Sequence, residues 1–199
     1  MNATSVLVAL VAVSSTLVGQ EPTTSGSPTP SRLSAPSGYH FAGIAWGSGP
    51  DSVKAALARE GLTFLGNDSL GDLMFTGRII LRRAAVVASM HDGHAVRVIV
   101  AFDKTPRSTL LLYRSVKREL LSKYGPPTSS TEVFLPPSGE GDGNEDSAFV
   151  TKKAAFLSQW RTDVGEKLSL LIDERPTVML FYQSPDWPAE EARRAKSAP

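Results

Sequence analysis

Apolar residues recur at helical spacing in the segment that follows residue 48. Val53, Ala56 and Leu57 fall on one face of a helix. Ser48 suits the N-cap position, because a serine hydroxyl can accept a hydrogen bond from a free backbone amide of the first turn. Gly61 suits the end, since glycine adopts the left-handed conformation that often follows a helix. The pattern predicts a first helix between these two residues.

A second helix is predicted from about residue 107 to residue 124. Leu112, Val116 and Leu120 are spaced by four residues, and Tyr113 widens the apolar stripe. Gly125 and the two prolines after it end the helix, because proline cannot continue the hydrogen-bond ladder.

The two predicted helices contain similar short sequences. Residues 52–57 read Ser-Val-Lys-Ala-Ala-Leu, and residues 115–120 read Ser-Val-Lys-Arg-Glu-Leu. Runs rich in Val, Ile, Leu and aromatic residues follow each copy, and we expect strands at about 73–76, 79–90, 95–102, 148–161, 167–173 and 177–183. Two helix–three-strand repeats then predict an α+β fold, in which one mainly antiparallel six-stranded sheet carries both helices on one face.

The dipeptide Asp92-Gly93 predicts a two-residue hairpin turn between two of these strands. In that register the numbers of two facing residues add up to 185, so that Val87 opposes Val98 and Ala85 opposes Val100. This more apolar face should meet the helices. On the other face the pairs would be Ala88 with Arg97 and Val86 with Ile99.

The remaining segments suggest an exported chain with one folded domain. Residues 6–13 are almost wholly apolar, too few to span a bilayer but typical of the core of a signal peptide. Pro, Ser, Thr and Gly dominate the stretch that follows, which is typical of a flexible linker. The expected organisation is a signal peptide at 1–19, a disordered linker at 20–38, a domain at 39–187 with halves at about 39–104 and 105–187, and a flexible tail at 188–199.

Charge and cysteine content narrow the function classes. The formal net charge of +1 argues against a nucleic-acid-binding protein, which usually has a strong basic patch. The chain has no cysteine, which excludes disulfides, a thiol nucleophile and a lipid-modified N-terminal cysteine. We therefore expect a periplasmic or extracellular protein whose mature chain does not insert stably into a membrane, and we predict no cofactor.

The first helix resembles a known envelope motif. The spacing Gly47-x5-Val53-x3-Leu57 is similar to the start of the helix in small envelope domains of the BamE/SmpA type. Val116-x3-Leu120, with Gly125 after it, resembles the helix end of the same pattern. Duplicated versions are similar to the beta-lactamase-inhibitor-protein architecture. The resemblance implies a protein-binding module of the cell envelope, with a partner from the envelope or the extracellular space.

Two groups of residues have types that bind metal ions. His91 and His94 flank the predicted turn and would point to one side, where they could share a metal ion or simply be exposed. Asp142, Asn144 and Asp146 alternate like the start of a calcium loop, but Ser147 and Lys153 occupy the positions that require Gly and Glu. The alternative for this second group, within the predicted long loop 128–147, is a solvated acidic loop.

No catalytic motif is present. The chain lacks a Gly-x-Ser-x-Gly elbow, a phosphate-binding glycine loop and a His-Glu-x-x-His helix. We therefore favour a non-enzymatic binding or interaction module that uses the helix-free face of the sheet, with Arg97, Ile99 and Trp160 as candidate contact residues. The alternative for the aromatic residues is a packed core. The alternative functions are a hydrolase with an unrecognised site and a carrier of small molecules or lipids.

Overall fold

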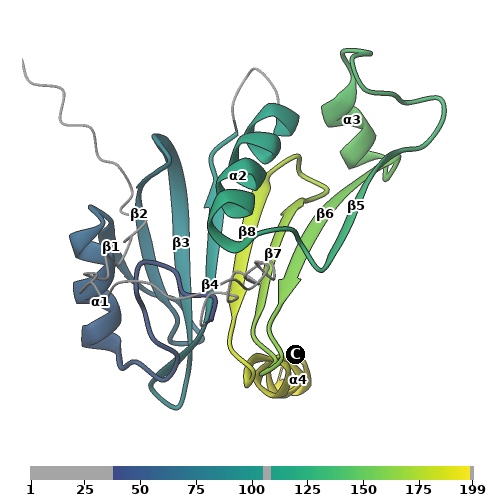
Figure 1. Ribbon diagram of the computed structural model, residues 1–199. Helices are drawn as coiled ribbons and strands as arrows, with labels where there is room; N and C mark the ends of the chain where they lie inside the picture. Colours follow the sequence, from purple (N-terminus) through teal and green to yellow (C-terminus); the bar gives the residue numbers. More distant parts are fainter. Residues whose placement is uncertain (1–37, 105–108, 198–199) are drawn as a thin grey trace, which may run out of the picture.

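The computed structural model describes residues 38–104 and 109–197 of the chain. It contains one eight-stranded sheet in which all neighbouring strands are antiparallel (Figure 1). The strands are β1 (Thr63–Asn67), β2 (Leu73–Ile79), β3 (Arg82–His91), β4 (His94–Phe102), β5 (Ser129–Phe134), β6 (Ala154–Arg161), β7 (Lys167–Ile172) and β8 (Val178–Gln183). The helices are α1 (Pro50–Arg59), α2 (Thr109–Tyr124), α3 (Glu145–Val150) and α4 (Trp187–Ser197).

The order of the strands is β1-β2-β3-β4-β8-β7-β6-β5. The first four strands follow each other across the sheet, and the last four follow in reverse. Strand β4 pairs with β8 at the centre, where Arg97 faces Gln183 and Ile99 faces Phe181. Each half of the sheet is therefore a four-stranded meander preceded by a long helix, α1 or α2.

One face of the sheet is covered by α1 and α2, and we call it the helix face (Figure 1). Every second residue of each strand directs its side chain to this face. The register of the paired strands aligns these side chains in rows across the sheet. One such row runs through Phe75, Val86, Val100, Leu180, Leu170 and Ser158, all of which are buried. Burial of this face against the helices forms the hydrophobic core.

The end of α1 follows the predicted pattern, and its beginning differs slightly. Val53, Ala56 and Leu57 are buried, as the spacing predicted. The N-cap is Gly49 instead of Ser48, and no side chain caps the helix there. Gly61 follows the helix with a φ of +76°, a conformation that favours glycine.

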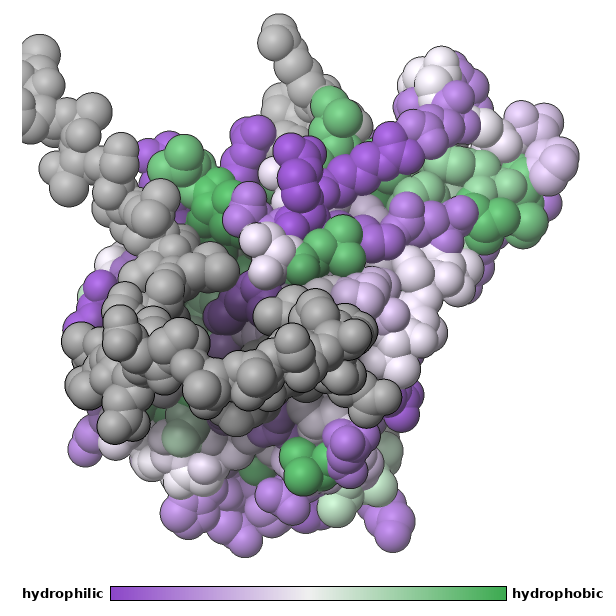
Figure 2. Space-filling model, in the orientation of Figure 1, coloured by the Kyte–Doolittle hydropathy of each residue, from purple (hydrophilic) through white to green (hydrophobic). Residues whose placement is uncertain are grey.

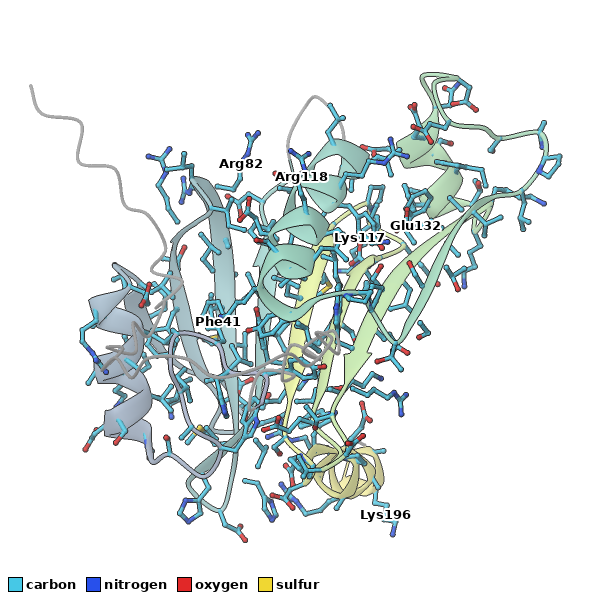
Figure 3. All side chains as sticks on the ribbon, in the orientation of Figure 1. Phe41, Arg82, Lys117, Arg118, Glu132 and Lys196 are labelled. Carbon is cyan, nitrogen blue, oxygen red and sulfur yellow. The ribbon has the colours of Figure 1, made fainter. Side chains whose placement is uncertain are left out.

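The segment before α1 crosses the helix face and contributes aromatic residues to the core. The Tyr39 ring meets the Tyr124 ring edge-on at 5.2 Å. Phe41, labelled in Figure 3, lies 5.5 Å from the ring of Tyr182. The Tyr39 amide also donates to the buried carboxylate of Glu166. These contacts attach the beginning of the domain to its second half.

The predicted six-stranded sheet made of two three-strand repeats is wrong, because the sheet has eight strands. The two unpredicted strands, β1 and β5, form its outer edges. Most of their residues are exposed, so neither strand has the alternation of apolar and polar residues that marks a half-buried strand. Strand β5 also lies in the segment 128–147, which its composition had predicted to be a long loop.

Two boundaries were also predicted wrongly. The expected strand at 79–90 is interrupted by a turn at Ile80 and Leu81, which have φ values of +50° and +60°. Neither residue type signals such a turn, since glycine or asparagine is usual at positive φ. The expected strand at 148–161 begins with α3, and β6 starts only at Ala154.

The hairpin turn at Asp92-Gly93 is confirmed, but the predicted register is wrong by one residue. His91 faces His94, as a two-residue turn requires, whereas Ser89 already faces Arg97. Val96 is therefore an extra residue in β4, a β-bulge. Beyond it Val86 faces Val100 and Ala88 faces Val98, so that both strands turn their most buried residues to the helix face.

The ends of the chain differ in how far the structure describes them. The predicted signal peptide, 1–19, and all but the last residue of the predicted linker, 20–38, lie outside the described residues. At the other end a flexible tail was expected from residue 188, but residues 188–197 belong to α4. Trp187 and Glu190 of this helix are buried.

Adjacent leucines on β7 test the assignment of the two faces. Leu170 is fully buried on the helix face, whereas Leu171 is half-buried on the opposite face. We expect Leu170→Ala to lower the free energy of unfolding by about 2–5 kcal/mol. Leu171→Ala should lower it by only about 1 kcal/mol, since less apolar area is lost from the folded state. Urea unfolding measures both values, and equal losses would contradict the assignment.

Candidate functional site

The face of the sheet opposite α1 and α2 carries a broad apolar surface, which we call the open face. Its first row, from β2 to β8, consists of Met74, Val87, Ile99 and Phe181. A parallel second row, from β3 to β6, consists of Ala85, Ala101, Met179, Leu171 and Leu157. Ala85 is exposed, and the other members of the two rows are half-buried.

A polar row borders the open face on the side of α4. Arg97 of β4 faces Gln183 of β8, Gln183 faces Lys167 of β7, and Lys167 faces Arg161 of β6. Arg97 and Gln183 lie two positions along their strands from Ile99 and Phe181 of the first row, a distance of about 7 Å, whereas Lys167 and Arg161 lie beside the polar Ser169 and Gln159. We call Arg97, Gln183, Lys167 and Arg161 the cationic row, because three of them carry a positive charge.

Between α4 and the cationic row the surface is hollowed. The hollow has a volume of about 350 Å³. It is lined by Arg161, Thr162, Gly165, Lys167, Gln183, Ser184, Trp187, Pro188 and Glu191. Two cations and one carboxylate are among these residues, together with the neutral polar groups of Thr162, Gln183 and Ser184. The hollow is therefore suited to a small polar group that carries negative charge.

Arg97 is held between two aromatic rings at the edge of this site. Its guanidinium carbon lies 4.7 Å from the ring centre of Phe181 and 4.3 Å from that of Trp187. Burial lowers the pKa of Arg97 from its ordinary value, the carboxylates of Glu191 and Asp72 raise it, and the nearby Arg194 lowers it. Its Nε is buried and has no hydrogen-bond acceptor among the described residues.

Lys167 is the second cation of the row that is partly removed from solvent. Burial lowers its pKa, and the positive charges of Arg161 and Arg97 lower it further, while Glu191 raises it. Within the described part of the chain, no carboxylate lies within ion-pair distance of Lys167, Arg161 or Arg97. The row itself therefore carries three positive charges, and Glu191 is the nearby carboxylate that acts on both Lys167 and Arg97.

Helix α4 is fixed beside the hollow by a buried ion-pair network. Arg194 donates to both carboxylate oxygens of Asp72, at 2.7 and 2.8 Å, and to the carbonyl of Met90 at 2.9 Å. Glu190 accepts hydrogen bonds from Arg193 and Arg194, and only 1% of its side chain is exposed. These contacts join α4 to β2 and β3 and thereby position Trp187 over Arg97.

The structure separates the three predicted contact residues. Arg97 and Ile99 point to the open face from the same strand. Trp160 lies on the helix face, where it is 1% exposed and donates from Nε1 to the carbonyl of Gly125 at 2.9 Å. Sequence reasoning missed Lys167 and Arg161. The alternation of side chains along β7 and β6 can be read from the sequence. The alignment of Lys167 and Arg161 with Arg97, however, depends on the order of the strands in the sheet.

The predicted metal ligands form separate local contacts. His91 Nδ1 lies 2.7 Å from a carboxylate oxygen of Glu190, and His94 Nδ1 lies 2.8 Å from the carbonyl of Gly47. In the loop before α3, the Asp142 carboxylate accepts hydrogen bonds from the amides of Gly139 and Asn144. These bonds lower the pKa of Asp142. Among the described residues, no three His, Cys, Asp or Glu side chains come together as a metal site.

A polar network beneath α2 contains a lysine and two serines. Ser130 Oγ lies 3.1 Å from Lys117 Nζ and 2.9 Å from Ser158 Oγ. Tyr113 lies 2.9 Å from Ser158, and burial raises its pKa far above the ordinary value. Lys117 and Glu132, labelled in Figure 3, form an ion pair. Because Lys117 is held by Glu132 and Ser130 of β5, we interpret this network as a structural link between α2 and the β5–β6 hairpin.

Comparisons with protein-family models, curated proteins and solved structures found no match. The similarity to BamE/SmpA-type domains and to the beta-lactamase-inhibitor-protein architecture therefore stays a prediction. None of the helices among the described residues is long and apolar enough to cross a membrane.

The attachment of α4 should depend on pH through Glu190. The hydrogen bond from Arg193 and the contacts with Arg194 lower the pKa of Glu190 to about 2. Because this value lies below the ordinary carboxylate pKa of about 4.5, the stabilisation is complete at neutral pH. It should be lost progressively as the pH falls from about 4.5 towards 2.

We expect the melting temperature of the wild type to fall more steeply over this pH range than that of Glu190→Gln. At pH 7 the variant should be less stable than the wild type, since the arginines lose their charged partner. Thermal melts monitored by circular dichroism measure both effects. Parallel pH profiles for the two proteins would contradict the role of Glu190.

Proposed function

We propose that this protein is a non-enzymatic binding module of the cell envelope that binds a partner protein through the open face of its sheet. The observation that supports this proposal is the combination of two apolar rows with the adjoining cationic row on the same face. A surface of this kind has both an apolar centre and a polar margin, as protein interfaces commonly do.

The residue types of the open face suit protein binding. Met74 and Met179 have flexible, polarizable side chains that adapt to an opposing surface. Phe181 and Ile99 add larger apolar groups beside each other at the centre of the sheet. Six neighbouring strands of the sheet, β2, β3, β4, β8, β7 and β6, contribute to this face. Their width is about 24 Å at the usual spacing of strands. Because the backbone is hydrogen-bonded throughout, little conformational entropy would be lost on binding.

The helix side has a different character. Figure 2, drawn in the orientation of Figure 1, shows hydrophilic residues over much of the described part of this side and hydrophobic ones in separate patches, one of them around α3 and β5. The exposed apolar residues there include Val133, Leu135 and Val150. They belong to the edge of the domain, whereas the open face has its apolar residues at the centre. This contrast favours the open face as the principal contact surface.

The envelope location in this proposal is supported by the sequence. The apolar segment 6–13, the linker-like composition after it and the absence of cysteine are typical of an exported, non-acylated protein. The similarity of the α1 region to BamE/SmpA-type domains supports the same location.

A charge placed on the open face should prevent binding. We expect the wild type to capture a reproducible set of proteins from an envelope extract of the source organism, and Ile99→Glu to capture at least tenfold less, because the new carboxylate would have to be desolvated. The matched control is Leu70→Glu, which introduces the same charge at a turn residue that is 63% exposed. Quantitative mass spectrometry of the captured proteins measures the effect.

Circular dichroism and thermal melting must first show that both variants are folded. Equal capture by the wild type and Ile99→Glu would contradict the proposal, and so would the absence of specific capture by the wild type.

A further inference from the structure

Two cations of the cationic row face each other without forming an ion pair with a carboxylate of the described residues. Arg161 and Lys167 form a directly opposed pair on β6 and β7. At such positions the Cβ atoms are about 4.5–5.5 Å apart, and like charges destabilise the pair of strands. No carboxylate of the described residues forms an ion pair with either of them. The folded chain therefore holds two like charges side by side at the hollow, where Glu191 contributes the one carboxylate of the lining.

Buried hydrogen-bond donors lie at the same end of the sheet. Trp187 lines the hollow, and its Nε1 is buried without an acceptor among the residues that the structure describes. Arg97 Nε, next to the same indole ring, is in the same situation. Buried donors usually have a partner, so their presence indicates that an acceptor from outside these residues can be accommodated nearby.

The charges of the hollow indicate how much negative charge it can accept. Arg161 and Lys167 contribute two positive charges and Glu191 one negative charge, so the lining has a net charge of +1 (2 − 1). A single carboxylate would neutralise this charge, whereas a dianion would exceed it and would be repelled by Glu191 more strongly than a monoanion. Gln183 and Ser184 add neutral polar groups to the lining. Singly charged carboxylates are thus favoured over phosphate groups.

We propose that the hollow binds an Asp or Glu side chain of the partner protein, with Arg161 and Lys167 donating hydrogen bonds to its carboxylate. This inference rests on the proposed function, because the hollow adjoins the open face at which the partner would bind. The acidic residue would lie at the margin of the contact, next to the polar residues Ser169 and Gln159 that continue the first row across β7 and β6. Charge-assisted hydrogen bonds at this position would set the orientation of the partner.

The arrangement is prepared for binding before the partner arrives. Arg161 and Lys167 are held side by side by the register of the β6–β7 hairpin. Trp187 is held by the ion pairs of α4. The repulsion between the two cations would be relieved when a carboxylate lies between them, so binding restores an electrostatic balance that the free protein lacks. An uncharged side chain would leave this repulsion in place, which makes charge the basis of selectivity.

A capped glutamate, N-acetyl-glutamate N-methylamide, tests the inference without knowledge of the partner. We expect its titration into the 15N-labelled wild type to shift the backbone amides of Lys167, Gln183 and Ser184, with a dissociation constant on the order of millimolar. Arg161→Gln combined with Lys167→Gln should weaken this binding at least tenfold. The control pair, Arg118→Gln with Lys153→Gln, removes the same charge from exposed positions on α2 and before β6 and should leave the binding unchanged.

Three results would overturn the inference. They are equal shifts with capped glutamine, the neutral isostere; unchanged binding by the Arg161→Gln/Lys167→Gln protein; and at least tenfold tighter binding of inorganic phosphate at the same amides. The capture experiment with Ile99→Glu separates the two proposals. If that variant loses the partner while capped glutamate does not bind the wild type, only the carboxylate site is wrong. If capped glutamate binds as expected but capture is insensitive to Ile99→Glu, only the open-face function is wrong.

Discussion

The pairing of β4 with β8 is the interaction on which the rest of the structure depends. It joins two four-stranded meanders into one sheet and sets which residues of the two halves share a face. Because side chains alternate along a strand, a slip of one residue here would turn the whole apolar set of one half away from the helices. Val98 opposite Tyr182 and Val100 opposite Leu180 keep the core continuous across this seam.

The same register produces the candidate binding surface. If Val98 and Val100 face the helices, then Arg97 and Ile99 must face the opposite side, next to Gln183 and Phe181. The core and the open face are thus two consequences of one pairing. The β-bulge at Val96 is required for this outcome, since without it either β3 or β4 would direct its apolar residues away from the helices.

The sequence was informative where a local pattern decides the structure. The buried stripe of α2 and the turn at Asp92-Gly93 follow from spacing and from turn-forming residue types. The edge strands β1 and β5 could not be predicted in this way, because a strand with mostly exposed residues has no alternation to detect. The cationic row was also beyond local reasoning, since its members come from four strands whose order in space is not their order in the chain. Trp160 lies in the core, which is the alternative that the sequence left open for the aromatic residues, because its position in β6 directs it to the helix face.

The bulge also connects the core to the hollow. At Val96 the carbonyl accepts a hydrogen bond from the amide of Ser184, the first residue after β8. This bond holds the chain where it leaves the sheet towards α4, and the contact of Arg194 with Asp72 fixes the far end of that helix on β2 and β3. With both ends held, Trp187 must lie over Arg97 and one wall of the hollow must be α4. The position of the proposed carboxylate site is therefore a consequence of how the last helix is attached, in addition to the strand order that brings its cations together.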